Sequence, residues 1–225
     1  MKYENIKSGR FISRPNRFIA YVDILGKQEI CHVKNTGRCK ELLTEGATVY
    51  LEESQNPFRK TKYDVVAVQK EEKLINMDSV APNKAAEEYF KKQFEGVKRE
   101  VTYKNSRFDL FIKDNNTFVE VKGVTLEKDN IAMFPDAPTE RGRKHIYELI
   151  DAVKNGFNAK IVFVIQFKGA KSFIPNYKTD EEFKKALLIA QENGVQVEAY
   201  DCLVSPSELN INERVKVCLD WSLPI

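Results

Sequence analysis

The sequence predicts a two-domain chain of the α/β (α+β) class, with a small β-barrel in residues 1–80 and a mixed sheet flanked by helices in residues 81–225. The barrel is predicted because short apolar, β-branched segments alternate with turn residues in the first third of the chain. The mixed sheet is predicted because helical and strand patterns alternate in the remainder. A length of 225 residues allows one large domain or two small ones.

The strand-like segments of the first domain are short and closely spaced. They are Phe18–Leu25, Glu29–Val33, Ala47–Leu51, Tyr63–Val68 and Leu74–Ile75. The first two are a hairpin candidate because Gly26 and Lys27 form a turn between them. About five short strands in roughly 75 residues are typical of a small barrel such as an OB-fold. Asp78–Asn83 then has the composition of a linker.

The second domain begins with a predicted helix, Lys84–Glu95, and continues with the strands Val97–Tyr103, Ser106–Ile112 and Thr117–Val124. Thr139 can cap a second helix. Thr179 and Glu182 form a capping-box pattern for a third. Further strands are predicted at Ala159–Gln166, Val195–Tyr200 and Val215–Leu219. Because Ala159–Gln166 is apolar throughout, we expect it to be buried on both faces.

Composition excludes several classes of protein. Hydrophobic residues make up 42% and charged residues 31% of the chain, a balance without a signature of disorder. No apolar run is long enough for a membrane span or a signal peptide, so no membrane partner is expected. The four cysteines are scattered, with no CxxC pair, which argues against a zinc site. Without an export signal they indicate reduced thiols and a cytoplasmic location.

Positive charge is concentrated near the N-terminus. Residues 1–80 contain 14 Lys and Arg against 11 Asp and Glu, whereas residues 81–225 contain 22 of each. Phe11 and Phe18 are interleaved with this charge. The pattern alone favours a solvated edge strand over phosphate binding, and both interpretations stay open. The cations in the first 18 residues are Lys2, Lys7, Arg10, Arg14 and Arg17.

The segment Ser106–Val124 brings acidic and basic residues together. Side chains alternate along a strand, so Glu120 and Lys122 lie on one face. A turn centred near Asn115 puts Asp109 opposite about Val121, within one residue of both. The same alternation predicts that the apolar residues of the first strand, Phe108, Leu110 and Ile112, share its other face.

Two carboxylates beside an ammonium group suit phosphodiester chemistry. Asp109 and Glu120 supply the hard oxygen ligands that Mg²⁺ or Mn²⁺ prefers, and the Val121 carbonyl could complete the metal shell. Lys122 could orient or deprotonate a water molecule. The alternative is a cross-strand ion pair on a solvent-facing sheet, which the spacing alone favours.

Two further features favour a functional site. Residues 130–143 read as a long irregular segment rich in charge, and such loops often carry function. Gln166 is a polar residue at the carboxyl end of an apolar strand, where open α/β sheets place ligands. Arg141 near the start of the second helix could meet a phosphate, although surface charge is the default. For His145 a capping or surface role is the favoured interpretation.

At these residues the chain resembles the sugar fermentation stimulation protein A (SfsA) family, which is related to nucleases of the PD-(D/E)xK, or restriction-endonuclease-like, superfamily. The resemblance spans nearly the whole chain, and its longest stretch, MFPDAPTERGRKHIYEL, is specific. The other matching stretches are GRFISRPNRF, VKNTGRCKELL, SQNPFRKTKYD, APNKAAEE, SRFD, FVEVKGVTLE and FVIQ.

The resemblance implies an N-terminal OB-like domain, a C-terminal restriction-endonuclease-like domain, and binding and cleavage of DNA or RNA with little sequence preference. Asp109, Glu120 and Lys122 match the family motif. Glu87 stands where many such nucleases keep an accessory acid, although a solvated helix face is slightly favoured. Gln166 stands where related nucleases often have a supporting polar residue, and packing at a strand end is an equal alternative.

We therefore predict a nuclease that depends on Mg²⁺ or Mn²⁺ and acts on DNA, RNA or both. The alternative is a DNA-binding regulatory protein that keeps the nuclease scaffold with little or no catalysis. The sequence leaves the oligomeric state open, and a homodimer is one alternative because nucleases that cut both strands often pair. The residues expected to contact nucleic acid are Arg10, Arg14, Arg17, Arg38, Arg59 and Arg141.

Overall fold

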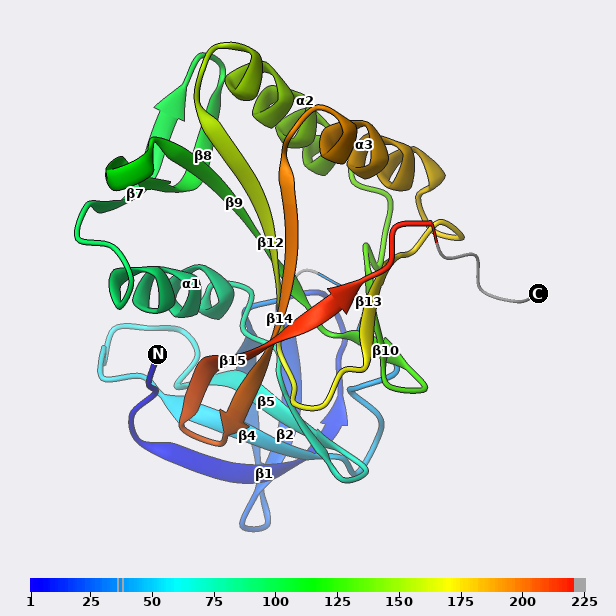
Figure 1. The fold of residues 1–225 in the computed structure, drawn as a ribbon. Coiled ribbons are helices and arrows are strands. Elements are labelled where there is room, and N and C mark those ends of the chain that lie inside the picture. Colours follow the sequence, from blue (N-terminus) through cyan, green and yellow to red (C-terminus); the bar gives the residue numbers. More distant parts are fainter. Residues whose placement is uncertain (36, 38, 221–225) are drawn as a thin grey trace.

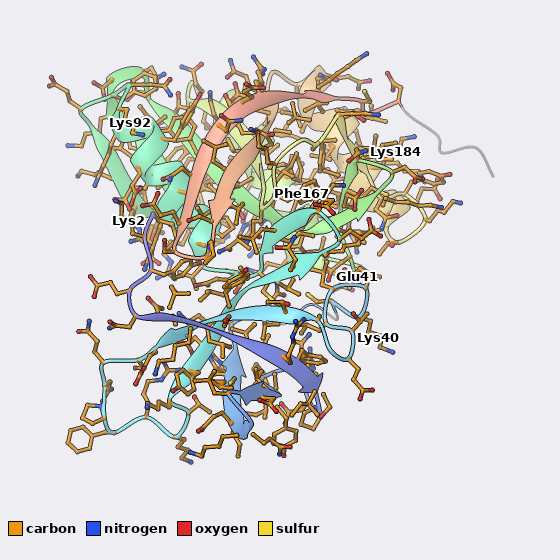
Figure 2. All side chains as sticks on the ribbon, turned by 90° about the horizontal axis from the view of Figure 1, so that it is seen from below. Lys2, Lys40, Glu41, Lys92, Phe167 and Lys184 are labelled. Carbon is orange, nitrogen blue, oxygen red and sulfur yellow. The ribbon has the colours of Figure 1, made fainter. Side chains whose placement is uncertain are left out.

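The computed structural model describes residues 1–35, 37 and 39–220, which form two domains joined side by side (Figure 1). Within these residues no helix is long and apolar enough to cross a membrane. Charged side chains such as Lys2, Lys92 and Lys184 lie at the outside of the molecule, whereas Phe167 is fully buried inside it (Figure 2).

The N-terminal domain is an OB barrel. Its strands are β1 (Ile6–Ser13), β2 (Ile19–Ile24), β3 (Lys27–Val33), β4 (Thr48–Glu53), β5 (Tyr63–Lys70) and β6 (Lys73–Asn76). They pair in the order β3-β2-β1-β4-β5-β6, and a further parallel pairing of β3 with β5 closes the barrel. The N-terminal basic segment contributes β1, which pairs with β2 and β4 on its two sides. The prediction of a small barrel such as an OB-fold is confirmed.

The C-terminal domain is built on a mixed sheet with the order β10-β11-β13-β15-β14-β12-β9-β8-β7. Parallel pairing joins β9, β12 and β14, and antiparallel pairing joins β7, β8 and β9. Its strands are β7 (Val97–Tyr103), β8 (Ser106–Ile112), β9 (Thr117–Val124), β10 (Leu126–Lys128), β11 (Ile131–Phe134), β12 (Asn158–Ile165), β13 (Ser172–Pro175), β14 (Gln196–Ser205) and β15 (Glu208–Val217).

Helices cover both faces of this sheet (Figure 1). Helix α1 (Ala81–Lys91) packs on one face, and α2 (Glu140–Lys154) and α3 (Glu181–Glu192) pack on the other. The central strand β12 shows the consequence, because Val162 and Val164 join the core on the α1 side while Phe163 and Ile165 join the core on the α2 side. The prediction that this strand is buried on both faces is confirmed.

Three local predictions were wrong for identifiable reasons. Helix α1 begins inside the predicted linker, because Pro82 is tolerated in the first turn of a helix. Residues 130–143 are less irregular than expected. Asp129 and Asn130 both take positive φ and form the turn that connects β10 to β11, so the segment begins as part of a β-hairpin. Asp180, not Thr179, caps α3 by accepting a hydrogen bond from the Phe183 amide at 3.0 Å.

Polar contacts tie the barrel to the second domain. The carboxylate of Glu127 in β10 accepts from Lys70 and Lys73 of the β5–β6 hairpin at 3.1 and 2.8 Å. These contacts hold the pKa of Glu127 at about 2: burial opposes the shift, but the hydrogen bonds from Lys73 and the Asn130 amide outweigh it. The hairpin is therefore fixed against the edge of the larger sheet.

Loss of this carboxylate is expected to weaken the fold. A group whose pKa is depressed by folding stabilises the protein above its ordinary pKa, and that stabilisation is lost as the pH falls toward the folded value. Glu127→Gln should lower the free energy of unfolding by about 1–3 kcal/mol at pH 7. The difference in unfolding free energy between Glu127→Gln and the wild type should become smaller as the pH falls from about 4.5 to about 2, as measured by urea unfolding.

Glu182 provides a matched control, because its side chain is 64% exposed and pairs with Lys185 on the surface of α3. Glu182→Gln should change the stability by less than about 1 kcal/mol. Equal stability of Glu127→Gln and the wild type at pH 7 would contradict a role for this contact in joining the domains.

Candidate active site

The β8–β9 hairpin brings Asp109, Glu120 and Lys122 to one cavity. Its ladder pairs Leu110 with Val119, and Oδ2 of Asp109 accepts a hydrogen bond from the Val121 amide at 2.8 Å. The carboxylate of Asp109 thus lies across the hairpin from the Glu-x-Lys segment, as the turn centred near Asn115 predicts.

Glu120 is the most enclosed member of the group, with only 2% of its surface exposed. Its Oε1 atom lies 2.5 Å from Nζ of Lys122 and 2.5 Å from Nδ1 of His145. Its Oε2 atom is buried and has no hydrogen-bond partner among the described residues. One carboxylate oxygen is therefore held from two sides, while the other is unpaired among the described residues, an arrangement that is costly for a buried oxygen.

The two carboxylates have opposite pKa shifts. Burial and the neighbouring charge of Glu120 raise the pKa of Asp109, although the hydrogen bond from the Val121 amide opposes this. Burial also acts to raise the pKa of Glu120, but the hydrogen bond with His145 and the charge of Lys122 outweigh it, so this pKa is lowered. When two carboxylates lie close together beside cations, their repulsion can raise the pKa of one while the cations lower the pKa of the other.

His145 is buried beside Glu120, so the favoured interpretation of it as a capping or surface residue was wrong. It lies on the second turn of α2. The start of this helix is fixed by Thr139, whose hydroxyl accepts from the Gly142 amide, and by Asp180, which accepts from the Thr139 amide and from Arg143. Sequence alone could not reveal this contact, because it depends on how α2 packs against β9.

Helix α1 contributes Asn83 to the site, whereas the family resemblance points to Glu87 on the same helix as an accessory acid. Nδ2 of Asn83 donates to Oδ1 of Asp109 at 2.6 Å. Glu87 instead pairs with Lys91 at 2.8 Å and with Arg99 at 3.6 Å, and it is not among the residues that line the cavity. The side chain that reaches the hairpin is thus one helical turn before Glu87.

The strand alternation of β8 breaks at Asp109. Phe108 packs with Phe118 in the core on the α2 side, whereas Leu110 and Ile112 belong to the core on the α1 side. The expectation that all three share one face was therefore wrong. Glu100, on the neighbouring strand β7, has a φ of +53° near this position. Asp109 therefore lies at the point where the apolar side chains of β8 change from the core on the α2 side to the core on the α1 side.

The cavity is small and polar, with a volume of about 170 Å³. In the described part of the chain, no group of three or more His, Cys, Asp and Glu side chains is arranged to hold a metal ion. A metal here would thus depend on the two carboxylates, the Val121 carbonyl and water. The cavity is lined by Asn83, Glu100, Arg107, Phe108, Asp109, Glu120, Val121, Lys122, Arg141 and His145.

Comparison with known proteins identifies the family. Residues 77–208 match the family described as the sugar fermentation stimulation protein RE domain, and residues 12–77 match the SfsA N-terminal OB domain. The chain belongs to the SfsA family. Its fold is also similar to that of Pyrococcus furiosus SfsA in complex with Ca²⁺, with a TM-score of 0.86, 29% sequence identity and coverage of 96% of this chain and 97% of that one.

Curated members of the SfsA family match over nearly their whole length. The chain is 55% identical to the sugar fermentation stimulation protein homolog of Ruminiclostridium cellulolyticum and 52% identical to that of Clostridium beijerinckii. Each alignment covers 97% of this chain and 100% of the relative. These relatives therefore share both domains.

Gln166 lies away from the carboxylates, at the contact between the two domains. Its Nε2 atom donates to Oδ1 of Asn76 at 2.8 Å and to the Asp78 carbonyl at 3.1 Å. Its backbone also pairs with Asn76 and with Val124 at the end of β9. Gln166 thus joins the barrel to β9, the strand that carries Glu120, and supports the position of that strand without contacting the carboxylates.

The predicted nucleic-acid-binding arginines have different environments. Arg141 is exposed and lines the carboxylate cavity, so it is the one that lies beside the candidate site. Arg10 is exposed on the barrel and donates to Thr48, while Arg59 is paired with Asp64 at 2.6 Å. Arg38 lies outside the described residues.

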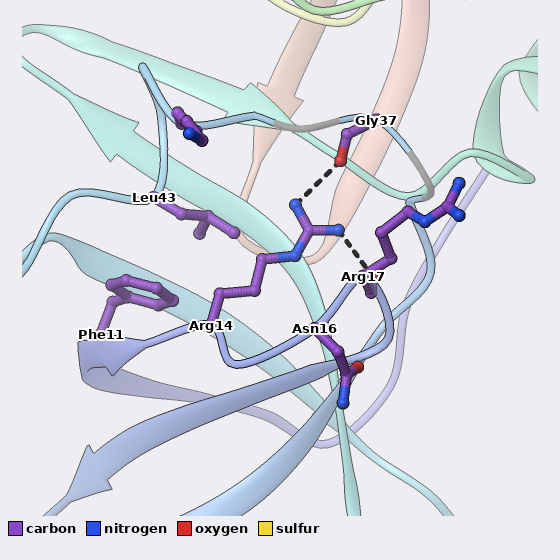
Figure 3. Close-up of a pocket in the computed structure, with 7 residues that line it drawn as sticks. Phe11, Arg14, Asn16, Arg17, Gly37 and Leu43 are labelled. Carbon is purple, nitrogen blue, oxygen red and sulfur yellow. Dashed lines mark hydrogen bonds between the residues drawn. The ribbon is translucent and has the colours of Figure 1, made fainter.

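Arg14 and Arg17 line a separate hollow of about 440 Å³ on the barrel, shown in Figure 3. The guanidinium group of Arg14 donates to the carbonyl oxygens of Gly37, Arg17 and Asn35 at 2.9, 2.6 and 2.6 Å. It thereby fixes the loop that carries Arg17, whose own side chain is exposed. These contacts give Arg14 a structural role in the loop.

The raised pKa of Asp109 provides a test of the geometry. Removing the negative charge of Glu120 should lower the Asp109 pKa, because the repulsion that disfavours its ionised form is lost. We expect this shift in Glu120→Gln when the Asp109 carboxyl is titrated by ¹³C NMR in EDTA. Glu87→Gln, which removes a carboxylate outside the cavity, should leave the titration unchanged. An unchanged Asp109 pKa in Glu120→Gln would show that the two carboxylates are not coupled.

Proposed function

We propose that the protein is a divalent-metal-dependent nuclease that hydrolyses phosphodiester bonds in DNA, RNA or both. The observation that carries the proposal is the buried Oε2 atom of Glu120, which has no partner among the described residues and lies in a cavity that Asp109 also lines. Two hard carboxylates with a nearby carbonyl suit Mg²⁺ or Mn²⁺. The similar SfsA of Pyrococcus furiosus forms a complex with Ca²⁺, another hard divalent cation, which supports this assignment.

Asp109, Glu120 and the carbonyl of Val121 would hold the metal. When bound, such an ion neutralises developing charge and lowers the pKa of bound water. Lys122 lies 2.5 Å from Glu120 and can both orient that carboxylate and donate to a phosphate oxygen. Arg107 and Arg141 line the same cavity and add positive charge for an anionic substrate.

Cleavage assays with matched variants test the proposal. Glu120→Gln and Lys122→Ala should each reduce metal-dependent cleavage of DNA and RNA by at least about a hundredfold, because each removes charge from the reacting centre. Glu87→Gln is the control, since it removes a carboxylate from outside the cavity, and it should retain activity. The substrates are single-stranded DNA, double-stranded DNA and RNA in Mg²⁺, Mn²⁺ or EDTA.

Equal cleavage by all variants would identify a contaminant and overturn the proposal. Binding of nucleic acid with no cleavage by the wild-type protein would instead support the alternative function, a DNA-binding regulatory protein on a nuclease scaffold.

His145 is expected to act as a positioning residue for Glu120. His145→Leu removes the donor to Oε1 and should weaken Mn²⁺ or Ca²⁺ binding by about 10- to 100-fold in calorimetry. His145→Asn keeps an N–H donor near the position of Nδ1 and should recover most of the affinity. The positioning role fails if His145→Leu folds and binds metal as tightly as the wild type, or if His145→Asn is no better than His145→Leu.

A further inference from the structure

A polar cavity of about 180 Å³ lies between the two domains and shares no lining residue with the carboxylate cavity. We call it the interdomain cavity. The barrel and the linker contribute Asn35, Gly37 and Ser79, and the second domain contributes the ends of β9 and β12 and the segment that follows β11. Among the described residues that line it there is no Lys, Arg or His, and Asp136 is the one carboxylate. The interdomain cavity therefore offers oxygen acceptors and a single negative charge.

Gln166 brings a buried amide of fixed orientation to the interdomain cavity, since only 2% of this residue is exposed. Oδ1 of Asn76 accepts from the Asp78 amide at 3.2 Å, so the Gln166 atom that lies 2.8 Å from this oxygen is the donor Nε2. Nε2 also donates to the Asp78 carbonyl at 3.1 Å, which uses both of its protons. Oε1 is therefore an acceptor, and no described residue donates to it.

Gly123 leaves room beside this oxygen. A Cβ atom at position 123 would lie 2.6 Å from Oε1 of Gln166, and both residues line the interdomain cavity. A buried acceptor without a donor is costly, so the exposed side of Oε1 is suited to a ligand that supplies positive charge or a proton.

Asn35 and Asp136 bring two more oxygens together across the boundary between the domains. A Cβ atom on Gly37 would lie 2.5 Å from Oδ2 of Asp136 and 2.9 Å from Oδ1 of Asn35. Both oxygens therefore face one small region beside Gly37. No described residue forms a hydrogen bond or an ion pair with the Asp136 carboxylate. Two acceptors that face each other repel unless a donor or a cation lies between them.

The amide of Asn35 cannot turn to relieve this repulsion. Its Oδ1 accepts from the Gly37 amide at 2.8 Å, and its Nδ2 donates to the Met77 carbonyl at 3.0 Å. Arg14 holds the same loop, because it donates to the carbonyl of Asn35 at 2.6 Å and to that of Gly37 at 2.9 Å (Figure 3). Asp136 is exposed, so a small ligand can reach the site from solvent.

We infer that the interdomain cavity binds a monovalent alkali cation, K⁺ or Na⁺, between Asn35 of the barrel and Asp136 of the second domain, with Oε1 of Gln166 as a further oxygen of the site. Carbonyl oxygens can replace the hydration shell of such an ion. One carboxylate balances one positive charge, whereas the affinity for Ca²⁺ depends on the number of charged ligands. The cavity has room for the ion and several water molecules, since each water takes about 30 Å³. The bound ion joins the two domains, and this role is independent of the nuclease function.

Thermal unfolding in EDTA tests this inference, with KCl, NaCl and choline chloride compared at equal ionic strength. K⁺ or Na⁺ should raise the unfolding midpoint of the wild type by about 3–6 °C relative to choline when the salt is about tenfold above its dissociation constant, because the ion binds only the folded protein.

Variants at Asp136 separate an ion site from a contact that is merely structural. The amide introduced by Asp136→Asn can donate to Oδ1 of Asn35 in place of the ion. This variant should therefore lose the dependence on K⁺ and Na⁺ and be at least as stable in choline as the wild type. Asp136→Ala should lose the dependence without gaining a donor. Glu45→Gln is the matched control, because Glu45 is exposed on the barrel and lies outside the cavity, and it should respond to the salts as the wild type does.

Equal midpoints of the wild type in all three salts would overturn the inference, as would an unchanged salt response in Asp136→Asn. Protection that depends on Asp136 but comes only from millimolar Ca²⁺ or Mg²⁺, measured without EDTA, would overturn the assignment to a monovalent ion. These measurements contain no nucleic acid, so their outcome is separate from that of the cleavage assays.

Discussion

The site depends on how the carboxylate of Glu120 is held. His145 and Lys122 both approach its Oε1 atom, so the side chain has one orientation and its Oε2 atom is left without a partner in the described chain. Each donor comes from a different part of the fold, since Lys122 shares strand β9 with Glu120 and His145 comes from α2. The geometry of the site thus exists only when α2 is docked on the sheet.

The rest of the domain fixes that docking. Asp180 caps α3 and also accepts from the Thr139 amide and from Arg143, so one carboxylate ties together the starts of α2 and α3. On the other side of the hairpin, Asn83 of α1 holds Asp109. Helices on opposite faces of the sheet therefore each hold one of the two carboxylates, which is how a rigid scaffold positions reactive groups.

The sequence predicts the parts of this arrangement that depend on local pattern. Strand alternation puts Glu120 and Lys122 on one face, and the turn near Asn115 brings Asp109 to them. Contacts made by long-range packing cannot be predicted from local pattern, because the position of a helix along a sheet is not encoded in local periodicity. For this reason the sequence favours a capping or surface role for His145, which is in fact buried beside Glu120. The family resemblance points to Glu87 as an accessory acid, but the side chain of α1 that reaches Asp109 is Asn83, one turn earlier.

Burial bears on the choice between a functional site and a cross-strand ion pair. An ion pair on a solvent-facing sheet would keep its carboxylate hydrated, whereas Glu120 is 2% exposed. Burying a charged group with an unpaired oxygen destabilises a fold, and a second carboxylate with a raised pKa adds to that cost. A purely structural contact gains nothing from this arrangement. A site that gathers ligands for a cation does, because the bound ion would offset the repulsion that Asp109 and Glu120 create.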